Sequence, residues 1–131
     1  MRNIISQIGE NAGKIWQVIA DHGEATLDEI ESESDLDSKD LHAAIGWLAR
    51  ENKIRKEQDI YRLADTNLED DIGSTAGKVY KILDIWEQAD LTTMKRLSDR
   101  SDEDLYKALG WLAREDKIII DNNRKYSLKN E

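Results

Sequence analysis

The 131-residue sequence contains no cysteine, no proline and no phenylalanine. The absence of cysteine excludes a disulfide framework and thiolate metal sites. The absence of proline and phenylalanine, with 36% charged residues, is typical of a mainly helical protein with short loops. No apolar run approaches the roughly 20 residues that a membrane helix needs, and residues 1–5 are too short for a signal peptide. We therefore expect a soluble, cytoplasmic protein without a membrane partner.

Positive charge is also scarce. The chain carries 19 Lys and Arg against 28 Asp and Glu, which gives a net charge of −9. An acidic chain repels nucleic acid as a whole, so nucleic-acid binding would have to come from a local basic patch.

What the chain does have is an internal repeat. Residues 44–51 read AIGWLARE and residues 108–115 read ALGWLARE, an offset of 64 (108 − 44). The same offset carries residues 8–9 to 72–73 and residues 12–14 to 76–78. A constant offset indicates a tandem duplication, with unit 1 at 1–64, an acidic connector at 65–71 and unit 2 at 72–131. A unit of about 60 residues buries only about 60% of its unfolded surface, so we expect the units to pack on each other.

Each unit contains the same series of local patterns. An apolar stripe at i, i+3, i+4 and i+7 predicts a first helix beginning near Asn11, and near Ser74 or Thr75 in unit 2. Short second helices are expected at 27–32 and 91–97, and third helices after turns at 35–38 and 99–102. Hairpins follow at 53–57 with 60–63, and at 117–121 with 124–128. The fold class is therefore α+β and helix-dominated, with two tandem winged helix-turn-helix units of three helices and a β-hairpin wing each.

The residues of these units resemble a known family. An Ala-Gly-Lys-Ile-Trp opening and an Ala-Ile-Gly-Trp-Leu-Ala-Arg-Glu core followed by Lys-Ile are similar to small, uncharacterised, mainly prokaryotic winged helix-turn-helix domains. Unit 2 departs from the opening motif with Tyr80 in place of Trp16. The resemblance implies a winged-helix fold and, by analogy with the wider class, DNA binding or a transcription-linked role. Acidic tandem winged-helix proteins of chromosome-condensation complexes also resemble this chain in architecture and charge.

Nothing in the sequence predicts an enzyme. His22 and His42 are the two histidines, and Trp86 and Tyr106 replace them in unit 2. We interpret both as surface histidines and predict no catalytic residue, no metal ligand and no cofactor.

Our first functional hypothesis is a transcription- or chromosome-associated protein that binds double-stranded DNA through unit 2. A winged helix places the N-terminal part of its third helix in the major groove, and in unit 1 this part holds Asp37 and Asp40, which face phosphates unfavourably. Unit 2 has more cations, although an ordinary solvated face explains them equally well. The candidate nucleic-acid contacts are Lys95, Arg96, Arg100, Lys107, Arg114, Arg124 and Lys125.

The second hypothesis is a protein-interaction adaptor that binds no nucleic acid. An exposed glycine within a helix costs about 1 kcal/mol relative to alanine, and both third helices carry one on the face opposite their apolar stripe. Each neighbouring tryptophan could instead pack on its own wing or first helix. Unit 2 also has Ile85, Trp86, Ile119 and Ile120 where unit 1 has Asp21, His22, Arg55 and Lys56, which indicates an interface with unit 1 or with a partner. The candidate interface residues are Gly46, Trp47, Ile85, Trp86, Gly110, Trp111 and Ile119. The family resemblance favours the first hypothesis and the charge favours the second.

Overall fold

Two helix-dominated units form one continuous structure. The computed structural model describes residues 4–129. In unit 1 the elements are α1 (Ile4–His22), β1 (Glu24–Thr26), α2 (Leu27–Ser34), α3 (Ser38–Arg50), β2 (Ile54–Glu57) and β3 (Ile60–Leu63). In unit 2 they are α4 (Glu69–Trp86), β4 (Gln88–Ala89), α5 (Leu91–Ser98), α6 (Asp102–Arg114), β5 (Ile118–Ile120) and β6 (Tyr126–Leu128). The predicted α+β class with two winged helix-turn-helix units is confirmed.

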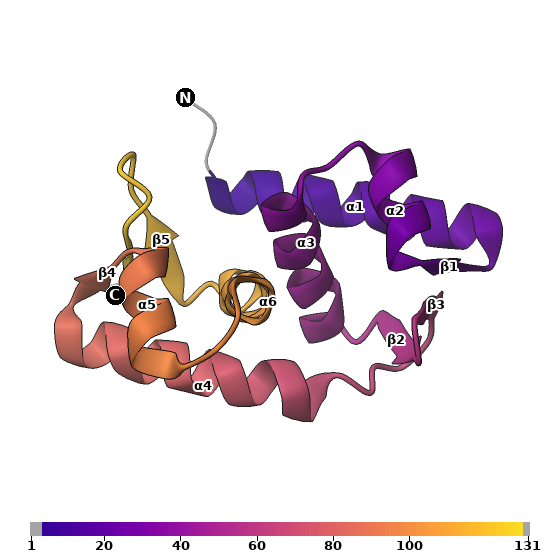
Figure 1. The fold of residues 1–131 in the computed structure, drawn as a ribbon. Helices are drawn as coiled ribbons and strands as arrows, with labels where there is room; N and C mark the ends of the chain where they lie inside the picture. The colour runs from indigo at the N-terminus through magenta and orange to yellow at the C-terminus, as the bar shows by residue number, and fades with distance from the viewer. Residues whose placement is uncertain (1–3, 130–131) are drawn as a thin grey trace.

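The third helices lie at the centre of the molecule. Figure 1 shows α3 and α6 side by side, with α1 along one edge, α4 along the opposite edge and the two small sheets at the two ends. This arrangement places the motif shared by both units, residues 44–51 and 108–115, in the middle of the fold.

Side-chain caps set the boundaries of the helix-turn-helix segments. The Thr26 hydroxyl accepts a hydrogen bond from the backbone N–H of Glu29, whose carboxylate accepts one in return from the N–H of Thr26. This capping box satisfies donors that the start of α2 would otherwise leave free. Asp35 ends α2 in the left-handed region, with φ of 58°, and its counterpart Asp99 has φ of 59°. The same local chemistry therefore forms the turn in both units.

Each wing is a three-stranded antiparallel sheet. The strand orders are β1-β3-β2 and β4-β6-β5, so a short strand before the second helix joins each predicted hairpin. In unit 1, for example, Ala25 pairs with Tyr61. The sequence did not predict strands β1 and β4, because two or three residues are too few to show an alternating pattern.

The hydrophobic cores cross the boundary between the units. Ile8 of α1 is buried in the cluster formed mainly by unit 2, whereas Leu68 and Ile72 are buried in the cluster of unit 1. Trp47 and Trp111 pack against both clusters. Each unit therefore completes its core with side chains from the other.

This exchange explains why the predicted start of each first helix was wrong. α1 begins at Ile4, the first described residue, and not near Asn11, which is buried within the helix. α4 begins at Glu69 and not near Ser74, so its first turn occupies part of the segment expected to be a connector. The additional helical turns bury Ile8 and Ile72 in the core of the other unit. The apolar pattern of a single unit does not predict this burial, because the packing partner is in the other unit.

His42 was also wrongly interpreted as a surface histidine. It is 4% exposed, and its Nδ1 lies 2.7 Å from the carbonyl oxygen of Ser38. Its position beside α6, with Nε2 3.8 Å from a carboxylate oxygen of Glu103, explains the burial. His22 is exposed as expected and forms an ion pair with Glu33. The hydrogen bond that the imidazole donates to the Glu33 carboxylate raises the pKa of His22.

Candidate functional site

The most distinctive geometry of the molecule is the crossing of α3 and α6. A Cβ atom added at Gly46 would lie 1.8 Å from the carbonyl oxygen of Lys107, and one added at Gly110 would lie 1.8 Å from that of Ala43. Because a real Cβ never approaches a backbone oxygen so closely, the two helices touch backbone to backbone. The contact is reciprocal under the 64-residue offset (107 − 43), as in the isologous interface of a twofold dimer.

Ion pairs repeat this symmetry at the rim of the crossing. Arg50 Nε lies 3.0 Å from a carboxylate oxygen of Glu115, and Arg114 Nε lies 2.9 Å from one of Glu51. The guanidinium of Arg50 also lies 5.6 Å from the ring centre of Trp111, at cation–π distance. Arg114, a candidate nucleic-acid contact, is therefore engaged between the units.

Each tryptophan also packs on the first helix of its own unit, at a glycine, as the alternative for these side chains predicted. At Gly9 of α1 an added Cβ would lie 2.9 Å from the Trp47 ring, and at Gly73 of α4 it would lie 3.6 Å from the Trp111 ring. The backbone contact of the two glycines and the cation–π contacts of the two tryptophans with the other unit's arginine place Gly46, Trp47, Gly110 and Trp111 at the contact between the units. Since these positions stand opposite each third helix's own core, the other unit covers the side that would be free in a single winged helix.

The remaining candidate interface residues lie elsewhere. Ile85, Trp86 and Ile119 are 72%, 54% and 49% exposed. These three do not bury against unit 1, so that half of the expectation is wrong for them, whereas Ile120 is partly buried against the cluster that contains Ile8 of unit 1. A role in contacting a partner protein stays a prediction.

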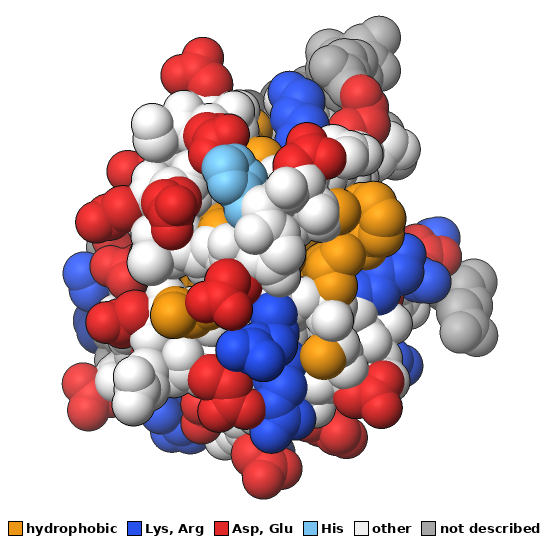
Figure 2. Space-filling view, turned by 90° about the vertical axis from the view of Figure 1, so that its right-hand side faces the viewer, with side chains coloured by type: hydrophobic (Ala, Val, Ile, Leu, Met, Phe, Trp, Pro, Cys, Tyr) orange, Lys and Arg blue, Asp and Glu red, His pale blue; other side chains and the backbone are white. Residues whose placement is uncertain are grey.

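The candidate nucleic-acid residues differ in their exposure and in their partners. Lys95 forms an ion pair with Asp102, with 3.1 Å between Nζ and a carboxylate oxygen. Arg100 and Lys107 are partly buried and line a common cavity, whereas Arg96, Arg124 and Lys125 are exposed. The opposite end of the molecule, which carries α2 and the unit 1 sheet, is shown in Figure 2, where acidic side chains lie beside a short basic stripe.

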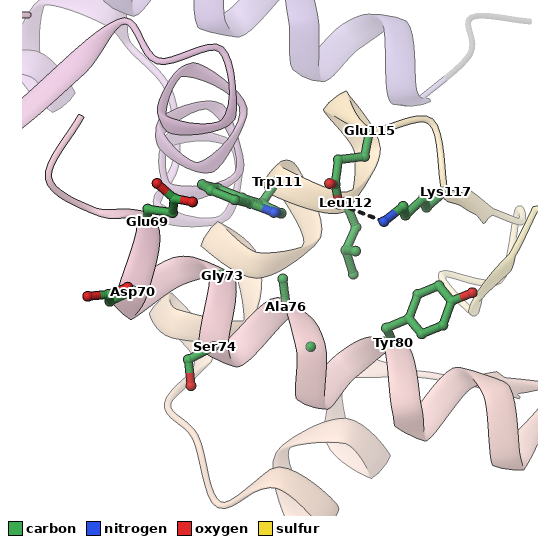
Figure 3. A pocket seen from close by; sticks show the side chains of 11 residues that line it. Glu69, Asp70, Gly73, Ser74, Ala76, Tyr80, Trp111, Leu112, Glu115 and Lys117 are labelled. Atoms are coloured by element: carbon green, nitrogen blue, oxygen red, sulfur yellow. Dashed lines mark ion pairs between the residues drawn. The ribbon is translucent and has the colours of Figure 1, made fainter. Parts of the chain in front are cut away.

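Equivalent hollows open beside the crossing, one in each unit. The unit 2 hollow, of about 550 Å³, lies between α4 and α6 with Trp111 on one side and Tyr80 on the other, as Figure 3 shows. Lys117 lies at its edge, with Nζ 3.5 Å from a carboxylate oxygen of Glu115 and 5.7 Å from the Tyr80 ring centre. The unit 1 hollow, of about 710 Å³, is lined by the corresponding residues Gly9, Ala12, Gly13, Trp16, Trp47, Leu48, Glu51 and Lys53.

Two glycines leave these hollows open. Apart from the helix's own backbone, no atom lies within 4 Å of a Cβ added at Gly13 or at Gly77. Both are exposed and lie inside helices, where glycine costs about 1 kcal/mol relative to alanine. The signal in the sequence for these hollows was the internal repeat: residues 12–14 are identical to residues 76–78, so both first helices carry a glycine at the same position.

Among residues 4–129, no group of three or more His, Asp or Glu side chains is arranged to hold a metal ion. Within the same residues, no helix has the length and apolar character required to cross a membrane.

Comparisons with known proteins agree with this architecture. The model of the family described as "Winged helix-turn-helix domain (DUF2582)" matches twice, at residues 1–64 and 66–129. An uncharacterized protein of Methanocaldococcus jannaschii, MJ1608, is 42% identical over 57 residues, which cover 41% of this chain and 80% of that protein. The mRNA-binding domain of elongation factor SelB from E. coli, solved with SECIS RNA, shows a remote likeness. Its TM-score is 0.42 and its identity 13%, over 92% of this chain and 98% of that one. From the two family matches, the chain belongs to the winged helix-turn-helix family DUF2582 and contains two tandem copies of its domain.

Proposed function

We propose that this protein is a non-enzymatic interaction adaptor that binds a protein partner and does not read nucleic acid with its third helices. The observation that carries the proposal is the backbone contact at Gly46 and Gly110. A recognition helix must present a free side to enter the major groove. Here α3 and α6 cover each other, so groove insertion would require the units to separate.

Electrostatics supports the same conclusion. The first turn of α6 carries Asp102, Glu103 and Asp104, all exposed, and α3 has Asp37 as its N-cap and Asp40 in its first turn. Carboxylates at the ends that would approach DNA repel its phosphates. The net charge of −9 adds to this repulsion at longer range.

The equivalent hollows are the surface that we assign to the partner. An exposed helical glycine with open space around it is unfavourable for the free protein, and it allows a partner's backbone or ring to approach the helix closely. The hollows also offer aromatic rings, which are enriched at protein interfaces. Ile85, Trp86 and Ile119, polar at the unit 1 positions 21, 22 and 55, are proposed to extend the partner surface of unit 2.

The experiment fills one hollow without disturbing the fold. The purified protein would be used to capture a partner, and the affinity of the purified partner would then be measured by calorimetry. We expect Gly77→Leu to weaken binding by at least about tenfold, since the new side chain occupies the hollow and meets no atom of the chain near its Cβ. Trp86→Ala tests the extended surface of unit 2.

A matched control is available in an exposed lysine of the same helix. Lys81→Ala lies four residues after Gly77, outside the residues that line the hollow, and should bind like the unaltered protein. Equal affinity for Gly77→Leu, Trp86→Ala and the control would contradict the proposal.

A second candidate function is nucleic-acid binding through phosphate contacts alone. The supporting observation is that Arg96, Arg124 and Lys125 are exposed, and none has an ion pair within residues 4–129. A mixed-sequence DNA duplex would be titrated at low and at physiological salt. Binding that weakens steeply with salt and is lost in the Arg96→Glu, Lys125→Glu variant would support this function over the adaptor. No binding of the duplex even at low salt would contradict this second function.

A further inference from the structure

A cavity of about 300 Å³ lies where unit 1's wing meets the first turns of α4 and α6. Three cations from three separate segments line it: Lys56 from β2, Arg100 from the turn before α6, and Lys107 from α6. The charged and polar groups that face them are Asp71, Asp104 and Thr75. The formal charge of the lining is therefore +1 (3 − 2) in a protein of net charge −9.

These three cations are partly buried and form no ion pair with a carboxylate of the described residues. Five Lys and Arg residues within 4–129 are partly buried. Of these, Lys39 and Arg55 form ion pairs with Asp40 and Glu57, with nitrogen–oxygen distances of 3.4 and 2.6 Å. The other three line the cavity, and among the described residues no carboxylate oxygen lies within 4.0 Å of their charged nitrogens.

Within residues 4–129, the surroundings of each cation also lack a carboxylate partner within ion-pair distance. Arg100 Nε is buried and has no hydrogen-bond partner among the described residues. The Lys56 ammonium lies 5.8 Å from the ring centre of Tyr61, at cation–π distance. Burial, and then the neighbouring charge of Lys56, lower the pKa of the Lys107 ammonium. Partly buried charges without partners are costly, and here three of them surround one space.

The fold itself does not need these cations. Under the 64-residue offset, Lys56, Arg100 and Lys107 correspond to Ile120, Leu36 and Ala43. At these three equivalent positions the same elements thus form without a cation. A structural role shared by both units would have left charge on both sides.

We propose that this cavity binds a small phosphate-bearing anion, a phosphate monoester or free phosphate, through Lys56, Arg100 and Lys107. A guanidinium and ammonium groups that converge on one space supply the charge-assisted donors that phosphate oxygens require. The volume is at the lower end of the range for ligand pockets, which favours a small ligand. Apolar Leu68 and Ile72 in the lining leave room for a short organic group. This site does not rest on the proposed adaptor function.

The test compares cations inside and outside the cavity. Inorganic phosphate would be titrated into the full-length protein and into Arg100→Gln, Lys107→Met and Arg96→Gln, with binding followed by 31P NMR and by calorimetry. We expect Arg100→Gln and Lys107→Met to weaken binding by about tenfold or more, because each removes a charge-assisted contact. Arg96→Gln, an exposed cation outside the cavity lining, should bind like the unaltered protein.

A stability measurement separates binding from a structural role. Without phosphate, Arg100→Gln and Lys107→Met should unfold at the same temperature as the unaltered protein or a higher one, since an unpaired charge has been removed. Destabilisation of both variants in phosphate-free buffer would overturn the proposal. So would no detectable binding by the unaltered protein at about 20 mM phosphate, which would nearly saturate a site with a Kd of about 1 mM.

A second titration identifies the source of the phosphate group. A mixed-sequence DNA duplex should not compete with inorganic phosphate at physiological salt. Binding of the duplex but not of free phosphate, lost in Arg100→Gln and Lys107→Met, would overturn the assignment to a small anion and place a nucleic-acid backbone at the cavity.

Discussion

Substituting the glycine at the helix crossing with alanine should destabilise the protein strongly, although alanine is the better helix former. At Gly46 the added methyl group would lie 1.8 Å from the carbonyl oxygen of Lys107, whereas ordinary contact begins at 3.4 Å. The helices would have to separate by about 1.6 Å at this point (3.4 − 1.8). Overpacking of this kind costs about 3 kcal/mol, and the gain in helix propensity offsets about 1 kcal/mol of it.

The expected net loss for Gly46→Ala is therefore about 2 kcal/mol, or about 6–10 °C in melting temperature for a chain of this size. Gly110→Ala should lose a similar amount, because its methyl group meets the carbonyl oxygen of Ala43 at the same distance. The assay is urea unfolding followed by far-ultraviolet circular dichroism. Gly13→Ala provides the matched control, since no atom lies within 4 Å of its added Cβ.

The sign of the change decides between packed and separate units. If α3 and α6 were exposed in solution, Gly46→Ala would behave like its control and stabilise the protein. A Gly46→Ala variant as stable as the unaltered chain would therefore refute the backbone contact, and with it the main argument against groove binding.

Four further predictions follow from the structure. Gly13→Ala and Gly77→Ala should each raise the free energy of unfolding by about 0.5–1 kcal/mol in urea titrations, and a loss of stability would show a neighbour within reach. In a double-mutant cycle, Arg114→Gln with Glu51→Gln should give a coupling of about 0.5 kcal/mol that falls with salt; a coupling near zero at low salt would remove this pair from the contact. Burial raises the pKa of Tyr61 and of Tyr126 to about 12. Because the unfolded chain loses these protons near pH 10, stability should fall between pH 10 and 12 by about 2 kcal/mol for each tyrosine. Unfolding at graded pH would measure this fall, and it should be smaller in Tyr61→Phe. The hydrogen bond that the His22 imidazole donates to the Glu33 carboxylate raises the pKa of His22. The contribution of this pair to stability is therefore fully present below the unfolded pKa of about 6.5 and is lost as pH rises through the folded value. NMR titration should show a lower His22 pKa in Glu33→Gln, and an unchanged value would contradict the pairing.

The sequence alone determined the duplication and the class of each unit. The 64-residue offset, the apolar stripes of the helices and the hairpin patterns are local signals, and local hydrogen bonding and burial periodicity are enough to produce them. The helix-turn-helix turns belong to the same category. Asp35 and Asp99 stand at equivalent positions because each turn needs a residue that tolerates the left-handed region.

The sequence also singled out Gly46 and Gly110 as unusual, but it did not identify what approaches them. That partner is the other unit's backbone, more than 60 residues away in the chain. The same long-range packing lengthened α1 and α4 beyond their predicted starts, because Ile8 and Ile72 gain burial only when the opposite unit is present.

Tertiary structure alone decided how the charged residues are grouped. Arg100, Lys107 and Arg114 were one set in the sequence, yet Arg114 pairs with Glu51 while the other two join Lys56 of unit 1 at a cavity. No spacing rule within a unit predicts this grouping, since it depends on how two copies of one fold cross. The sequence thus determined the fold of each unit, and the crossing of α3 and α6 determined which side chains of each unit are buried and which remain exposed.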